Sequence, residues 1–131
     1  MVPISHISLI KIKIKNPNKE LLKKTIEELA KEMNGSITNS VRDFYGNTYN
    51  VILAVKNEDF KFGIGVKVNE NGEVEIVGDF YKVPRHKIEE FQQKLIQRYT
   101  SNALQLALIQ LGFQTQTQKL QDKIIVRAWS L

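Results

Sequence analysis

Five side chains between residues 79 and 98 are the ones most able to do chemistry: Asp79, Tyr81, Arg85, His86 and Arg98. They lie where a predicted strand gives way to a predicted helix, so a carboxylate, a phenol, an imidazole and two guanidinium groups fall close together in the chain. Such a set could bind a small anion or move a proton. We predict these five as binding residues and assign no catalytic residue.

The same side chains also have a structural interpretation. Asp79 could pair with Arg85 or cap the start of the following helix, and Arg98 could brace the fold. Ion pairs and helix caps are much more common than functional sites, so the structural interpretation is favoured. We therefore expect a non-enzymatic protein, with an enzyme or a small-anion-binding domain using residues 79–98 as the alternative.

Other familiar site chemistries find no support in the sequence. The chain has no cysteine, which excludes disulfides, thiolate metal sites and a cysteine nucleophile. His6 and His86 are eighty residues apart and have no metal-ligand spacing, so no metal is predicted. Gly63-Ile64-Gly65 is not followed by the Gly-Lys pair of a phosphate-binding loop. We predict no cofactor.

The charge pattern bears on the kind of partner. The formal net charge is +5, with excess positive charge in residues 1–35 and 80–131 and excess negative charge in residues 36–79. Weak nucleic-acid binding by the basic helices is a less favoured alternative, because Lys61–Val68 does not match the aromatic octamer of an RNA-recognition motif. An unknown protein partner is favoured instead.

No apolar run approaches the roughly 20 residues that span a bilayer. The longest candidate, Ala103–Leu111, is interrupted by Gln105 and Gln110, and the amino end lacks the pattern of a signal peptide. We expect a soluble protein that is not secreted and has no membrane span.

The first half of the chain predicts one strand and one helix. Ile10, Ile12 and Ile14 alternate with lysines, which predicts a strand over Ile7–Lys15 with one buried face. Asn16-Pro17-Asn18 stops this strand and starts a helix, whose apolar stripe runs from Leu22 to Met33. Residues 36–40 are polar and are expected to form a loop.

Four short strands are expected next, over Val41–Tyr45, Tyr49–Lys56, Phe60–Val68 and Glu73–Tyr81. Tyr49–Lys56 is apolar on both faces, so it should lie in the middle of the sheet or at a contact between subunits, which leaves self-association open.

A long helix should begin at Pro84 or Arg85 and stop at Gly112, with an apolar stripe from Ile88 to Ile109 lying on the sheet. Two further strands are predicted over Phe113–Lys119, as a polar edge strand, and Ile124–Trp129. The order β-α-β-β-β-β-α-β-β predicts an α+β fold, with a mostly antiparallel sheet and two helices packed on one face. We expect residues 1–131 to form a single domain.

Several short motifs in this order resemble an uncharacterised protein family. They are Ser5-His6-Ile7-Ser8, Phe44-Tyr45-Gly46, Gly78–Val83, Gln97-Arg98-Tyr99, Gly112-Phe113 and Arg127-x-Trp129. The chain resembles hypothetical proteins encoded in red-algal and related plastid genomes and in cyanobacteria, as plastid open reading frame thirty-five. The resemblance implies a small soluble protein of the cyanobacterial cytoplasm or the plastid stroma. It implies no activity, and a binding or assembly module remains the favoured function.

Overall fold

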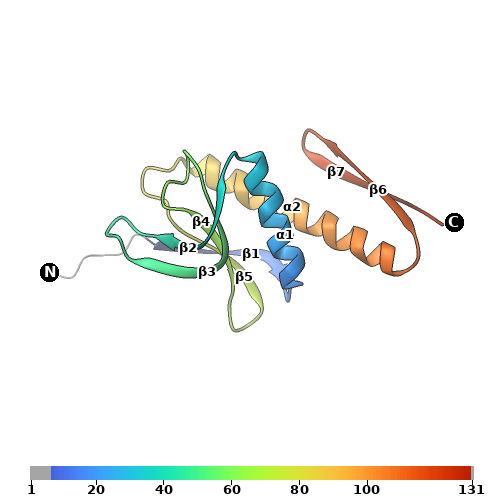
Figure 1. Cartoon of the computed structure of the whole chain (residues 1–131), viewed down its shortest axis with the longest axis horizontal. Helices are drawn as coiled ribbons and strands as arrows, with labels where there is room; N and C mark the ends of the chain where they lie inside the picture. Colours follow the sequence, from blue (N-terminus) through green and yellow to red (C-terminus); the bar gives the residue numbers. More distant parts are fainter. Residues whose placement is uncertain (1–6, 131) are drawn as a thin grey trace.

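The computed structural model describes residues 7–130 and consists of a five-stranded sheet, two helices and a separate two-stranded hairpin (Figure 1). The sheet has the strand order β1-β5-β4-β3-β2, and every neighbouring pair is antiparallel. The α+β fold class and the predicted order of elements are therefore confirmed. The elements are β1 (Ile7–Lys15), α1 (Lys19–Glu32), β2 (Ser36–Arg42), β3 (Thr48–Lys56), β4 (Ile64–Val68), β5 (Glu73–Asp79), α2 (Arg85–Gln110), β6 (Gln114–Leu120) and β7 (Lys123–Trp129).

The main core lies between one face of the sheet and the two helices. Helix α1 begins at Lys19 after its N-cap Asn18, whose side chain accepts a hydrogen bond from the Leu21 N–H. Its stripe of Leu22, Ile26 and Leu29 is fully buried against strand residues. Helix α2 adds Phe91 and Leu95 to the same core, so both helices cover one face of the sheet.

Part of the opposite face of the sheet is also buried. Val41 of β2, Ala54 of β3 and Val77 of β5 form a second buried cluster on this side. A register shift between Thr38 and Ser40 marks an irregularity in the β2–β3 pairing, and bulges of this kind bend a strand pair. Strand β3 contributes to both clusters, because Val55 packs in the main core and Ala54 in the second cluster.

Gly65 permits the close approach of β2 to this face. A Cβ atom at Gly65 would lie 2.9 Å from side-chain carbons of both Val41 and Val51, closer than packed atoms normally come. The glycine therefore lies in the strand for packing rather than for phosphate binding.

Several predicted strand boundaries are wrong. The strand expected over Val41–Tyr45 ends at Arg42, because the Gly46 N–H bonds to the Asp43 carbonyl in a turn. Residues 36–40 do not form a loop but begin β2, because their backbone pairs with β3 despite their polar side chains. Strand β4 starts at Ile64 rather than Phe60, because Gly63 has a φ of 92° and its N–H bonds to the Phe60 carbonyl in a turn.

The long helix has the predicted position, but its predicted packing holds only for its first part. Ile88, Phe91, Leu95 and Tyr99 contact the main core, whereas Ile109 is 51% exposed. Figure 1 shows α2 continuing beyond the sheet, with β6 and β7 beside its far part. These two strands pair only with each other among the described residues, so β6 is not an edge strand of the main sheet as expected.

Candidate functional site

Asp79 is buried at the end of β5 and joins two segments of backbone. Its Oδ2 accepts a hydrogen bond of 2.6 Å from the Phe44 N–H, and its Oδ1 accepts one of 3.1 Å from the Tyr81 N–H. It neither pairs with Arg85 nor caps α2, since the cap residue of that helix is Pro84 and no side-chain cap bond is present. Asp79 therefore holds the turn after β2 against the end of β5.

That turn is organised by a second buried carboxylate, Asp43, which sequence reasoning missed. Its oxygens accept hydrogen bonds from the backbone N–H groups of Tyr45 and Asn47, the Asn47 amide and the Tyr49 hydroxyl. Burial raises the pKa of Asp43, but these hydrogen bonds, led by those from Asn47, outweigh burial and hold the pKa below its ordinary value. An Asp followed four residues later by Asn around Gly46 is the signal that could have found this turn.

The two carboxylates together position a group of aromatic rings. Phe44 makes edge contacts with Tyr45, Phe62 and Tyr81 at centroid distances of 5.5, 6.5 and 5.7 Å. Three of these rings, Phe44, Phe62 and Tyr81, border a pocket of about 370 Å³ together with Asp79. The pocket is lined by Phe44, Glu58, Asp59, Lys61, Phe62, Asp79, Tyr81, Lys82, Val83 and Pro84.

Only two of the five predicted binding residues line this pocket. Asp79 and Tyr81 do so. Arg85 is almost fully exposed on α2 and pairs with Glu89 at 3.2 Å, and His86 is exposed beside it. Arg98 lies three helical turns further along and contacts Glu32. The structure thus does not bring the five side chains into one site.

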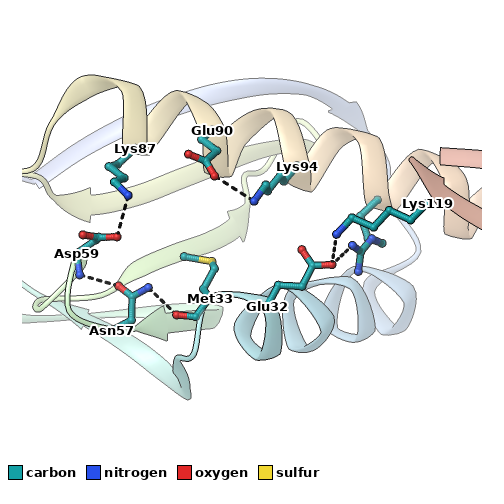
Figure 2. A network of polar contacts seen from close by, with 9 residues as sticks. Glu32, Met33, Asn57, Asp59, Lys87, Glu90, Lys94 and Lys119 are labelled. Carbon is teal, nitrogen blue, oxygen red and sulfur yellow. Dashed lines mark hydrogen bonds and ion pairs between the residues drawn. The ribbon is translucent and has the colours of Figure 1, made fainter. Parts of the chain in front are cut away.

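Arg98 belongs to a polar junction where α1, α2 and the hairpin meet. Glu32 of α1 forms ion pairs with Arg98 and, at 2.6 Å, with Lys119 of β6 (Figure 2). Burial raises the pKa of Glu32, but the hydrogen bonds and charges of Lys119 and Arg98 outweigh this and lower its pKa overall. In addition, the Gln97 amide donates to the Asp122 carbonyl at 2.7 Å. These contacts fix the turn of the hairpin to the body of the protein.

Toward its start, α2 is also held to the sheet by polar contacts. Lys87 pairs with Asp59 at 3.4 Å. The Asp59 N–H donates to the side-chain oxygen of Asn57, and the Asn57 amide donates to the Met33 carbonyl (Figure 2). The first half of the helix is therefore fixed by both apolar and charged contacts.

Residues 100–129, which we term the arm, have a different character. The arm contains the end of α2 and the β6–β7 hairpin. Neither buried apolar cluster of residues 7–130 extends beyond Tyr99. Several large apolar side chains of the arm are exposed instead: Leu104, Ile109, Leu111, Phe113, Leu120 and Trp129. Leu111 is the extreme case, with 75% of its surface exposed.

The arm is also depleted of charge. No charged residue occurs from Tyr99 to Gln118, although one residue in four is charged over the whole chain. Gln and Thr take the place of charged side chains here, at Gln105, Gln110, Gln114, Gln116 and Gln118 and at Thr115 and Thr117. Depletion of charge beside exposed apolar residues is typical of the centre of a protein–protein interface.

The model of one protein family, described as "Protein of unknown function (DUF1257)", matches residues 25–127 of the chain. The chain belongs to this family. The expected membership of an uncharacterised family is confirmed. The DUF1257 match includes α2, β6 and most of β7, so the arm is part of the family's domain rather than an appended tail. No curated protein and no solved structure matches the chain.

Two further observations concern this DUF1257 chain. Within residues 7–130, no three His, Asp or Glu side chains gather closely enough to hold a metal ion. None of the helices in the same range combines the length and the hydrophobicity that crossing a bilayer requires.

Proposed function

We propose that this protein is a non-enzymatic assembly module that binds a protein partner through the arm. The observation that carries the proposal is the continuation of one apolar stripe of α2 past the end of the sheet. Ile88, Phe91 and Leu95 pack on the core, while Leu106 and Ile109 repeat at the same helical spacing where neither apolar cluster extends. An apolar stripe that continues outside the core is typical of a surface that another protein covers, so it supports a protein partner at this position.

The chemistry of the arm favours a particular class of partner. Since no charge occurs from Tyr99 to Gln118, a partner gains little there from ionic steering. The surface fits a protein that presents apolar side chains and uncharged hydrogen-bonding groups. Nucleic acid fits it poorly, because phosphate contacts depend on Lys and Arg.

The geometry around Asp79 also supports binding over catalysis. Both of its oxygens accept backbone hydrogen bonds, and Arg85, His86 and Arg98 lie outside the pocket that Asp79 borders. The resemblance to plastid and cyanobacterial proteins supports placing the module in the cyanobacterial cytoplasm or the plastid stroma.

The proposal is tested by quantitative co-purification of the tagged full chain from native cells. The arm variant carries Ile109→Glu and Leu111→Glu, and a matched control carries Leu9→Glu at the 55%-exposed Leu9 of β1. We expect a defined partner to be lost with the arm variant and retained with the control. Equal recovery of every partner by all three proteins would overturn the proposal.

A second candidate function is small-ligand binding in the pocket beside Asp79. It is favoured by one observation, that Lys61, Lys82 and Tyr81 line one pocket of about 370 Å³. The two lysines are the groups that would hold an anion there, against the carboxylates of Glu58, Asp59 and Asp79 in the same lining. Inorganic phosphate titrated against the isotope-labelled protein should then shift the amide signals around Lys61 and Lys82, and Lys82→Ala should weaken the shift. Unchanged spectra at millimolar phosphate would remove anion binding as a function.

A further inference from the structure

The unpaired edge of strand β6 supports an inference that does not depend on the exposed apolar face of α2. Strand β6 pairs with β7 on one side, and no other described strand joins the hairpin. Six of the seven residues of β6 are exposed, with only Thr115 partly covered. The other side of β6 therefore offers a row of backbone N–H and C=O groups that a further strand can pair with.

This edge lacks the protection that another edge strand of the protein has. On β1, Lys11, Lys13 and Lys15 point outward from the sheet, and lysines at an edge discourage pairing between chains. On β6, the residues from Gln114 to Gln118 include no charge and no proline. The β6 edge is therefore open to pairing with a further strand.

We propose that the β6 edge is covered by β6 of a second copy of this chain, in an antiparallel, two-fold symmetric pair. A symmetric contact brings each surface against itself, so a charged edge would meet its own charge. The β6 edge avoids this conflict. Gln and Thr side chains both donate and accept hydrogen bonds, which makes the Gln114–Gln118 segment complementary to its own copy.

The register of the hairpin determines where the two-fold axis can lie. Leu120 pairs with Lys123 across a two-residue turn, so this closing pair is the first to exchange backbone hydrogen bonds. Bonded pairs alternate along an antiparallel ladder, so residues 114, 116, 118 and 120 direct their backbone groups toward β7. Residues 115, 117 and 119 direct theirs to the open edge.

An axis at Thr117 satisfies every one of these outward groups. Thr117 then pairs with Thr117 of the second copy, and Thr115 pairs with Lys119 in both directions. The two Lys119 side chains end four residues apart, which is about 13 Å along a strand, so they do not oppose each other. The outer strand of the resulting four-stranded sheet is β7, which carries Lys123 and Arg127 and stops further addition.

The test is the mass of the full chain in solution, measured by analytical ultracentrifugation over a concentration series. We expect a dimer of about twice the 15.1 kDa chain mass. Thr117→Pro removes the outward N–H at the axis and none of the N–H groups directed toward β7, so the dimer should be lost while circular dichroism shows an intact fold.

Charge variants at the axis test the register. Thr117→Lys and Thr117→Glu each place like charges directly opposite each other, which should weaken the dimer by about fivefold or more. An equal mixture of the two variants should restore it as a heterodimer, because Lys then faces Glu. If both variants dimerise as tightly as the wild-type chain, the axis does not lie at Thr117.

Three results would overturn this inference: a wild-type chain that stays monomeric, oligomers that grow without limit, or a dimer that ignores all three substitutions. None of these results would affect the protein partner proposed for the arm, because that proposal is tested at Ile109 and Leu111. Conversely, the chain could form the dimer while the variant with Ile109→Glu and Leu111→Glu still recovers every partner. That result would support the β6 contact and contradict the protein partner proposed for the arm.

Discussion

The two halves of α2 share one sequence pattern and have opposite surroundings. From Ile88 to Tyr99 the apolar stripe lies against the sheet and α1, with Leu95 fully buried. From Thr100 to Gln110 the helix continues beyond the core, and Ile109 is 51% exposed. The first half belongs to the core of the fold, and the second half is the part that we propose binds a protein partner. An apolar stripe predicts that one face of a helix is buried, but it does not show whether the same chain or another molecule covers that face.

The largest expected effect lies in the first half. Leu95→Ala removes a fully buried side chain from the core, so the free energy of unfolding should fall by about 2–5 kcal/mol. Urea denaturation measures this change. A loss below about 1 kcal/mol would mean that the half of α2 lying on the sheet contributes little to the core.

The next effect tests the joint between β5 and the Phe44 turn. Asp79→Ala leaves the partly buried N–H groups of Phe44 and Tyr81 without their acceptor, so stability should fall by about 1–3 kcal/mol. Asp79→Asn keeps one acceptor oxygen and should cost less. If Asp79→Ala is as stable as the wild-type protein in urea denaturation, the carboxylate does not hold this turn.

A smaller effect concerns the junction between the two halves. The pKa of Glu32 is lowered in the folded protein, so its contribution is present above the ordinary pKa of 4.5 and is lost as pH falls through the lowered value. Hydrogen exchange in β6 and β7 should therefore accelerate below pH 4.5, after correction for the intrinsic pH dependence. Glu32→Gln should abolish this extra acceleration and loosen the hairpin at neutral pH, by less than about 1 kcal/mol. Identical exchange in both proteins would show that Glu32 does not hold the arm.

The smallest effect on stability is expected in the second half. Ile109→Ala and Leu111→Ala remove exposed side chains, so each should change the free energy of unfolding by less than about 0.5 kcal/mol. The same urea experiment as for Leu95→Ala measures this. A loss above about 2 kcal/mol would contradict the division of α2 into a core half and an assembly half.

Local patterns in the sequence predicted much of the fold. The alternation in β1, the Asn18 cap of α1 and the spacing along α2 each follow from neighbouring residues, so each was predictable. The position of β2 was not, because its polar residues 36–40 gain strand structure only by pairing with β3. Likewise, the sequence sets the period of the α2 stripe but not where the sheet beneath it ends.

The candidate site was harder to predict for the same reason. Asp79 is correctly singled out, but its partner is the Phe44 N–H, 35 residues away, rather than a neighbour in the chain. Arg98 finds Glu32 across the helix pair at a separation of 66 residues. Proximity along the chain suggested one cluster from Asp79 to Arg98. The helix instead carries Arg98 roughly 20 Å away from Arg85 along its axis.

The most direct test of the assembly role is site-specific photo-crosslinking in native cells. A photoreactive residue in place of Ile109 should form a defined protein adduct, whose mass and peptides identify the partner. The same residue in place of the exposed Leu9 of β1 should form no such adduct. If no defined adduct forms at position 109, or if the same adducts form at both positions, the assignment of this half of α2 to assembly is contradicted.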